Sequence, residues 1–330
     1  MFKRNKNEVA SSAPALPGTN AAINNSSNAI LQELAIDYMR DKKVRRRWRF
    51  FWFGLVALYL ISTLILTAGG NSPTGYNKPH TALVELNGVI GAESSAAADK
   101  INHSLRKAFE SKQSKGVVLR INSPGGAPVQ SADINREITR LRELFPNKPM
   151  HVVISDMAAS GGYFVAAAAD KIFANRSSIV GSIGVRMDSF GFVDTIKKYG
   201  IERRSMTAGD NKSILDPFLP VKASQRKHIY KMLDQVHQHF IETVKAGRGE
   251  RISDDPDVYS GLFWSGEEAL GLGLIDDYGN LDYVARDVIG YEDIVDYTFQ
   301  PNLLDQLSKD FGIAVGVGIA NVVGGQFKLQ

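Results

Sequence analysis

The spacing of apolar residues changes several times along this chain, and each spacing predicts a different kind of element. Short apolar runs of the kind typical of buried strands lie at residues 81–89, 116–121, 152–154, 172–174 and 179–185. Segments that favour helices lie between and after these runs, at residues 100–112, 132–145, 163–169 and 224–246. This alternation of strands and helices predicts an α/β domain with a largely parallel sheet.

A longer apolar run covers residues 48–68, and its one charge, Arg49, lies beside its start. About 20 apolar residues in a helix cross the core of a bilayer. The basic cluster at residues 42–49 has no counterpart after the run, so the positive-inside rule places the N-terminus in the cytoplasm. A cleaved signal peptide is disfavoured because the run is long and starts late. A buried core helix is disfavoured because the polar face is missing. We expect a transmembrane signal anchor.

The anchor divides the chain into parts of different character. We expect four other segments. They are a largely disordered, basic cytoplasmic extension at residues 1–47, a linker at 69–80, a globular domain at 81–297 and a C-terminal tail at 298–330. The first 49 residues hold ten basic and four acidic side chains, while the whole chain carries a net charge of +4. The basic character therefore belongs to the N-terminus, and we expect no nucleic-acid partner for the domain.

The chain contains no cysteine. This excludes disulfides, thiolate metal sites and a cysteine nucleophile, and it suits an oxidising compartment. The sequence also lacks the phosphate-binding GxxxxGK[ST] loop and the zinc-binding HExxH motif. We therefore expect neither a cofactor nor a metal.

Ser160 is the first candidate for chemistry. It stands between two alanines and two glycines, directly after a predicted strand and before a predicted helix. A serine at a strand-to-helix turn lies near unpaired backbone N–H groups, which favour developing negative charge, and nucleophilic serines of other hydrolases are presented in this way. The alternative is a turn of small residues that packs tightly.

A second glycine pair, Gly125 and Gly126, follows the predicted strand at residues 116–121. Bare backbone at the carboxyl end of a strand can touch a substrate, and its amide N–H groups could stabilise an oxyanion. The alternative is an ordinary Pro-Gly turn.

A serine hydroxyl needs a base, which is usually histidine and in some enzymes lysine. None of the six histidines lies in a loop-borne Ser/His/Asp pattern; three of them (His228, His237 and His239) are expected on a solvated helix face. A lysine, with an ordinary pKa of about 10.4, becomes a base only where burial favours the neutral amine. Lys212 precedes the apolar residues Ile214 and Leu215, but this pattern alone does not single it out among the lysines.

Six segments in a fixed order give this chain a specific resemblance. They are Arg-Ile-Asn-Ser-Pro-Gly-Gly at 120–126, Met-Ala-Ala-Ser-Gly-Gly-Tyr at 157–163, Ala-Asp-Lys-Ile-Phe-Ala at 169–174, Gly-Ser-Ile-Gly-Val at 181–185, the Lys212 loop, and Trp-Ser-Gly-Glu-Glu-Ala at 264–269 with Gly-Leu-Ile-Asp at 273–276. Over residues 81–282 the chain resembles the SppA-type signal peptide peptidases. These are serine proteases of the ClpP/crotonase-like fold, which is built from repeated β-β-α units.

The resemblance implies a role for each matched residue. The nucleophile falls on Ser160, the general base on Lys212, and the serine that orients this lysine on Ser182. The oxyanion donors fall on the backbone N–H groups of Gly126 and Gly161. Without the resemblance, the Ser182 hydroxyl would be read as bonding its own turn.

The resemblance also implies an assembly, a substrate and a location. One copy of each motif matches the short form of the family, which builds homo-oligomeric rings, octamers among them, with serine and lysine from neighbouring subunits. We expect a single-pass protein of the bacterial inner membrane, with its protease domain on the periplasmic or extracytoplasmic side. The expected substrates are signal peptides left in the membrane and misfolded envelope proteins. The alternatives are a crotonase-type enzyme acting on coenzyme A thioesters and a non-catalytic membrane scaffold.

Overall fold

The computed structural model describes residues 47–64 and 77–300. The chain divides into two compact units, Met1–Ser72 and Pro73–Gln330. Most of the expected N-terminal extension, the end of the apolar run, most of the linker and nearly all of the C-terminal tail lie outside the described residues. The account of the second unit therefore covers residues 77–300.

In the first unit, residues 47–64 form one helix whose side chains are almost all exposed. None of the helices in the described segments meets the length and hydropathy needed to cross a membrane.

The second unit is built on an eight-stranded sheet with the path β6-β5-β3-β2-β1-β8. Its long strands β1 (His80–Asn87), β2 (Ser114–Ser123) and β3 (Met150–Ala159) pair in parallel. The short strands β4 (Lys171–Ala174) and β5 (Ile179–Gly181) both pair with β3, and β7 (Asp277–Tyr278) pairs with β4. β8 (Ile294–Asp296) is parallel to β1, and β6 (Phe263–Ser265) is antiparallel to β5. The largely parallel mixed α/β sheet is confirmed and is consistent with a ClpP/crotonase-like domain.

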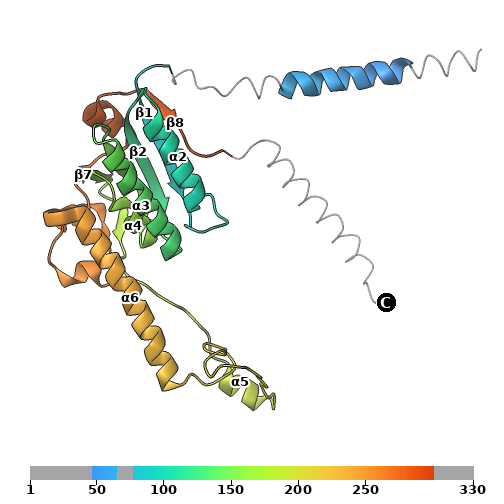
Figure 1. The fold of residues 1–330 in the computed structure, drawn as a ribbon, viewed down its shortest axis with the longest axis vertical. Helices are drawn as coiled ribbons and strands as arrows, with labels where there is room; N and C mark the ends of the chain where they lie inside the picture. The colour runs from blue at the N-terminus through green and yellow to red at the C-terminus, as the bar shows by residue number, and fades with distance from the viewer. Residues whose placement is uncertain (1–46, 65–76, 301–330) are drawn as a thin grey trace, which may run out of the picture. The chain divides into compact units, whose positions relative to one another are not determined.

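The order of the elements differs from the repeated β-β-α units that the resemblance implies, because one helix follows each of the first three strands. Strands and helices alternate from β1 to β4 through α2 (Ala98–Glu110), α3 (Pro128–Leu144) and α4 (Gly161–Ala166). Each of these helices returns the chain to the start of the next parallel strand, as a parallel sheet requires. Figure 1 shows α2 and α3 side by side over β1 and β2.

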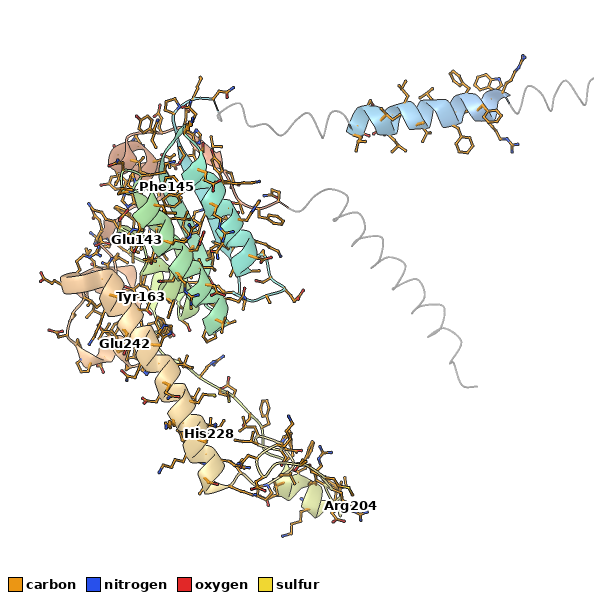
Figure 2. All side chains as sticks on the ribbon, in the orientation of Figure 1. Glu143, Phe145, Tyr163, Arg204, His228 and Glu242 are labelled. Atoms are coloured by element: carbon orange, nitrogen blue, oxygen red, sulfur yellow. The ribbon has the colours of Figure 1, made fainter. Side chains whose placement is uncertain are left out.

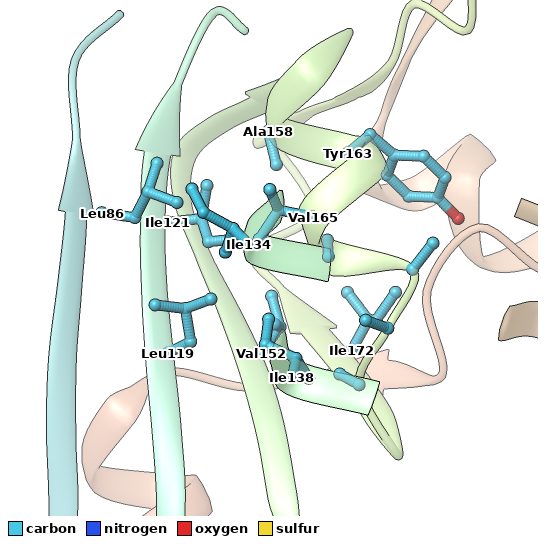
Figure 3. Close-up of a cluster of buried hydrophobic side chains, with 14 of the residues drawn as sticks. Leu86, Leu119, Ile121, Ile134, Ile138, Val152, Ala158, Tyr163, Val165 and Ile172 are labelled. Carbon is cyan, nitrogen blue, oxygen red and sulfur yellow. The ribbon is translucent and has the colours of Figure 1, made fainter. Parts of the chain in front are cut away.

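The main core lies between the sheet and these helices. Alternate strand residues such as Leu86, Leu119 and Val152 meet Ile134 and Ile138 of α3, and all five are inaccessible to solvent (Figure 3). The opposite face of the sheet buries a smaller cluster around Val118 and Val153. It is covered by α8 (Leu281–Tyr283) and the π-helical turn η3 (Val284–Ile289). The carboxyl ends of the strands are therefore presented by a sheet that is covered on both faces.

Helix α6 (Ala223–Arg248) belongs to the core only at its C-terminal end, where Phe240, Val244 and Arg248 are buried. Its N-terminal half extends away from the sheet and connects to a projecting segment, residues 186–222, that we call the arm and that contains α5 (Val193–Lys198). Figure 2 shows His228 on this half of α6 and Arg204 in the arm, both away from Tyr163 in α4.

Two contacts fix α4 against the C-terminal part of the domain. A Cβ atom at Gly247 of α6 would lie 1.9 Å from the carbonyl oxygen of Ala167, so only glycine allows this approach. The fully buried Tyr163 donates its hydroxyl hydrogen to the Leu274 carbonyl at 2.8 Å. The helix that follows Ser160 is thus held from two directions.

A buried ion pair joins the end of α6 to β4. The Arg248 side chain is 1% exposed and donates to Asp276 at 2.7 Å, and the same carboxylate accepts the Ile172 N–H at 2.7 Å and a bond from Arg251 at 2.9 Å. Burial alone would raise the pKa of Asp276, but the bonds from Arg248 and Ile172 outweigh it and hold the pKa below its usual value.

His80 is a correction to the expected linker. It is the first residue of β1, is fully buried, and its Nε2 lies 3.0 Å from the Tyr297 hydroxyl. The first strand therefore starts one residue earlier than expected. A polar imidazole can be buried at this position because the Tyr297 hydroxyl forms a hydrogen bond with it.

We expect Asp276→Ala to lower the free energy of unfolding by roughly 3–5 kcal/mol, because it leaves the buried Arg248 guanidinium without its counter-charge. Urea unfolding of the full chain at pH 7 measures the change. The control is Glu242→Ala, which removes an exposed carboxylate from α6 and should change stability by no more than about 0.5 kcal/mol. Equal losses in the two variants would contradict the assigned role of the ion pair.

We also expect His151 to make stability depend on pH. Burial lowers the pKa of this imidazole, and its Nδ1 has no hydrogen-bond partner among the described residues. The unfolded state therefore binds more protons below about pH 6.5, and the free energy of unfolding falls as the pH drops from there toward the folded pKa. Unfolding at pH 7.5 and 5.5 should show a smaller fall for His151→Leu than for the wild type. An unchanged fall would refute this assignment.

Candidate active site

Ser160 occupies the turn between β3 and α4 in a backbone conformation with positive φ, at φ +51° and ψ −123°. Its N–H donates to the Gly181 carbonyl at 2.8 Å, and its own carbonyl accepts the N–H groups of Tyr163 and Phe164. A non-glycine residue in such a conformation is strained and persists only where the surrounding structure enforces it. The strand, the turn and the helix therefore present this serine as the sequence predicted.

The glycine pair after β2 lies directly against this turn. A Cβ atom at Gly125 would lie 2.7 Å from the Gly161 nitrogen and 2.8 Å from the Ser160 Cβ. One at Gly126 would lie 2.0 Å from the Ile90 carbonyl oxygen. Both glycines have positive φ. The close approach of three backbone segments therefore depends on the absence of side chains at these positions.

The backbone amides of Gly126 and Gly161 lie close to each other. A Cβ atom built on Gly161 would be 3.2 Å from the Gly126 nitrogen, and both residues line the same cavity as Ser160. Gly161 is the first residue of α4, where the backbone N–H groups have no partner within the helix. The two predicted oxyanion donors are thus brought together next to the predicted nucleophile.

Ser182 reaches the same cavity from the turn after β5. It is the second non-glycine residue here with positive φ, at +53°, and its N–H donates to the Leu262 carbonyl at 2.7 Å. Because Ser160 is bonded to the neighbouring Gly181, the two serines are tied together through one backbone hydrogen bond. The structure therefore joins Ser160, Ser182, Gly126 and Gly161 in one place.

The cavity has a volume of about 880 Å³ and walls that are largely apolar. The apolar side chains of these walls are Val89, Pro124, Pro128, Phe164, Val185, Val236, Phe240 and Phe263. Such a lining, with a few polar groups that converge on one point, is typical of a site for an extended or apolar ligand. Within residues 47–64 and 77–300, no group of three or more histidine, cysteine or acidic side chains could hold a metal ion.

Lys212 is the one predicted site residue that the structure places elsewhere. It is exposed and lies in the arm, in a turn that also contains Leu215 with φ +64°. No lysine is found among the described residues that line the cavity of Ser160. Within a single chain, therefore, the predicted base and the predicted nucleophile do not meet.

The position of His237 corrects the prediction of a solvated helix face. It was expected on a solvated face, but it is half-buried, lines the cavity, and places its Nε2 3.0 Å from the Ile183 carbonyl oxygen. The signal was present in the helical spacing, because residues 237, 240 and 244 fall on one face and the last two are buried. His239 also lines the cavity, with its ring 5.7 Å from that of Phe164.

Comparison with known proteins gives three kinds of relative. The chain is 48% identical over 186 residues to a protein of Brucella abortus named Na(+)/H(+) antiporter NhaA, covering 56% of this chain but 25% of that protein. It is 34% identical over 222 residues to a putative protease of Methanocaldococcus jannaschii, covering 66% of this chain and 70% of the relative. It is 30% identical over 204 residues to a putative signal peptide peptidase SppA of Enterococcus faecium, covering 59% of each.

The chain thus spans about a quarter of the Brucella protein, and the remainder of that protein lies outside the similarity. The model of Peptidase family S49 matches residues 143–289. This range includes Ser160, Ser182 and Lys212 and omits the glycine pair after β2. The family match, the protease relatives and the geometry around Ser160 agree, and the chain belongs to Peptidase family S49, a family of serine proteases.

Proposed function

We propose that this protein is a membrane-anchored serine endopeptidase that uses a Ser–Lys dyad. The observation that carries the proposal is the strained Ser160, which lies in one cavity with the amides of Gly126 and Gly161 and with Ser182. A nucleophile, two oxyanion donors and a hydroxyl able to orient an amine are the parts that this chemistry requires.

In the proposed reaction the neutral amine of Lys212 takes the proton from the Ser160 hydroxyl as Oγ attacks the peptide carbonyl. The N–H groups of Gly126 and Gly161 stabilise the oxyanion. The protonated amine then gives its proton to the departing amine of the substrate. Water repeats the sequence on the acyl-enzyme, which frees the acid product and restores Ser160. The Ser182 hydroxyl accepts a hydrogen bond from the amine and so orients it.

The lysine comes from a neighbouring subunit. Lys212 is exposed in the arm, and the arm carries large apolar side chains that have little cover in a single chain, with Met206 96%, Phe190 78% and Tyr199 73% exposed. Exposed apolar surface on this scale marks a contact site. A ring of identical subunits, an octamer among the possible sizes, would cover the arm and exclude water from the amine, which favours the neutral form.

The substrates we propose are signal peptides left in the membrane after secretion, together with misfolded envelope proteins. The apolar walls of the cavity suit the apolar side chains of such segments. The name of the Enterococcus relative points to the same substrate class. An anchor at residues 48–68, with the N-terminus in the cytoplasm and the domain on the periplasmic or extracytoplasmic side of the inner membrane, would hold the site beside them.

Two tests separate this proposal from its alternatives. A fluorophosphonate probe should label Ser160 covalently, whereas an enzyme acting on coenzyme A thioesters through the oxyanion donors alone should not be labelled. Ser160→Ala and Lys212→Ala should both abolish cleavage of an apolar peptide while they remain folded and assembled. The topology has its own test, which uses a reporter enzyme that works only in the cytoplasm, fused after Gln330. If this fusion shows reporter activity, the proposed orientation is wrong.

We expect Gly125→Ala to slow the labelling of Ser160 by a fluorophosphonate at least about 100-fold, because the added methyl group would displace the oxyanion amides. Its Cβ would lie 2.7 Å from the Gly161 nitrogen, and φ at this position is +101°. The matched control is Gly91→Ala, since a Cβ there meets nothing within 4 Å. Labelling at the wild-type rate in Gly125→Ala would contradict the assigned geometry.

We expect the two inactive variants to restore activity when their subunits are mixed. In a ring with a dyad between subunits, Ser160 of a Lys212→Ala chain meets Lys212 of a Ser160→Ala chain at about one site in four in an equal mixture. Peptide cleavage after dissociation and reassembly measures this recovery. Each variant taken alone through the same procedure is the control. A mixture that stays inactive after verified exchange of subunits would place both groups of the dyad within one chain.

A further inference from the structure

We propose that His237 is a positioning residue for this reaction, which holds the Ser182 turn in its strained conformation by donating a hydrogen bond to the Ile183 carbonyl. The inference rests on the proposed Ser–Lys mechanism, in which Ser182 orients the lysine amine. His237 belongs to α6, which runs from the arm back to the core and lines the cavity on the way.

Three consecutive residues of the turn are bonded to three different parts of the domain. The Gly181 carbonyl accepts the Ser160 N–H at 2.8 Å, the Ser182 N–H donates to the Leu262 carbonyl at 2.7 Å, and the Ile183 carbonyl accepts from His237 at 3.0 Å. The first two bonds join backbone to backbone. The bond from His237 comes from a side chain, and it ties the turn to α6.

The chemistry of the two partners determines the direction of this bond. A carbonyl oxygen can only accept, so the His237 Nε2 must carry a hydrogen. This holds for the neutral Nε2–H tautomer and for the imidazolium, and the bond is therefore made in both protonation states. His237 is half-buried, and Ile183 is fully buried beneath it. The bond is thus partly shielded from water, which would otherwise replace the donor.

The position of the bond gives it a consequence for Ser182. Ser182 has φ +53°, a conformation that a non-glycine residue leaves when its surroundings allow it. The Gly181 bond ties the turn to Ser160 after β3, and the Ser182 bond ties it to Leu262 before β6. The bond to Ile183 ties the following peptide to α6. Without the bond from His237 the Ser182 hydroxyl can turn away from the cavity. Small displacements of orienting groups cost large factors in rate.

A set of three substitutions tests this role. His237→Gln places an amide N–H near the position of Nε2 and should keep kcat within about three-fold of the wild type. His237→Phe keeps the ring without a donor, and His237→Asn has a donor that falls short of the carbonyl. Both should lower kcat at least about ten-fold while KM changes by less than about two-fold, because the loss falls on orientation rather than on peptide binding. His103→Phe, on the exposed face of α2, is the control.

The comparison also separates positioning from proton transfer. A general-base histidine would lose nearly all activity in His237→Gln, and the pH–rate profile would lose the limb that the imidazole supplies. If His237 is a positioning residue, His237→Gln should keep the pH–rate profile of the wild type, because the amide N–H donates the same hydrogen bond as the imidazole N–H. Inactivity of His237→Gln, or wild-type kcat in both His237→Phe and His237→Asn, overturns the proposal. Urea unfolding and the assembly mass establish that each variant is folded and assembled.

Failure of this inference differs from failure of the proposed function. If the wild type cleaves peptides and Ser160→Ala does not, the serine mechanism stands whatever the His237 variants do. If Ser160→Ala or Lys212→Ala cleaves as fast as the wild type, the dyad itself fails, and the role of His237 fails with it.

Discussion

The strained backbone of Ser160 is the constraint on which the rest of this domain depends. A serine with φ +51° is less stable than an ordinary turn by roughly 1–3 kcal/mol, so neighbouring structure must hold it there. The Gly181 carbonyl accepts a hydrogen bond from the Ser160 N–H, and the Ser160 carbonyl accepts hydrogen bonds from N–H groups in the first turn of α4. The backbone of Gly125, which has no side chain, packs against the Ser160 Cβ. The glycines around the serine are therefore part of the same constraint, since any side chain at those positions would separate the three segments.

The second half of the chain supplies the rigidity that this turn needs. Helix α6 approaches α4 closely at Gly247, and the Tyr163 hydroxyl bonds to the Leu274 carbonyl on the far side of α4. The ion pair of Arg248 with Asp276 then joins α6 to β4. These contacts connect α4 and its C-terminal end to segments at least eighty residues later in sequence. Stability and site geometry are thus produced by the same set of buried contacts.

Local patterns predicted much of this arrangement, and long-range geometry produced the rest. The strands and helices follow from apolar spacing, and the turn at Ser160 follows from a small-residue segment between a strand and a helix. The burial of His237 could have been found from its spacing to Phe240 and Val244. The distance of Lys212 from the cavity could not have been found from the sequence, because it depends on the path of the long arm (Figure 1). Nor does any local pattern pair Arg248 with Asp276, since tertiary packing brings them together.

The bonds around Ser160 also determine when its strained turn can form. The Ser160 turn needs the loop after β2 and the turn after β5, and these segments are joined only once the sheet has formed. A chain that is still being made has the serine long before it has these partners. The partly made chain therefore carries Ser160 as an ordinary serine, and the strained presentation of its hydroxyl arises only when the sheet closes around the turn.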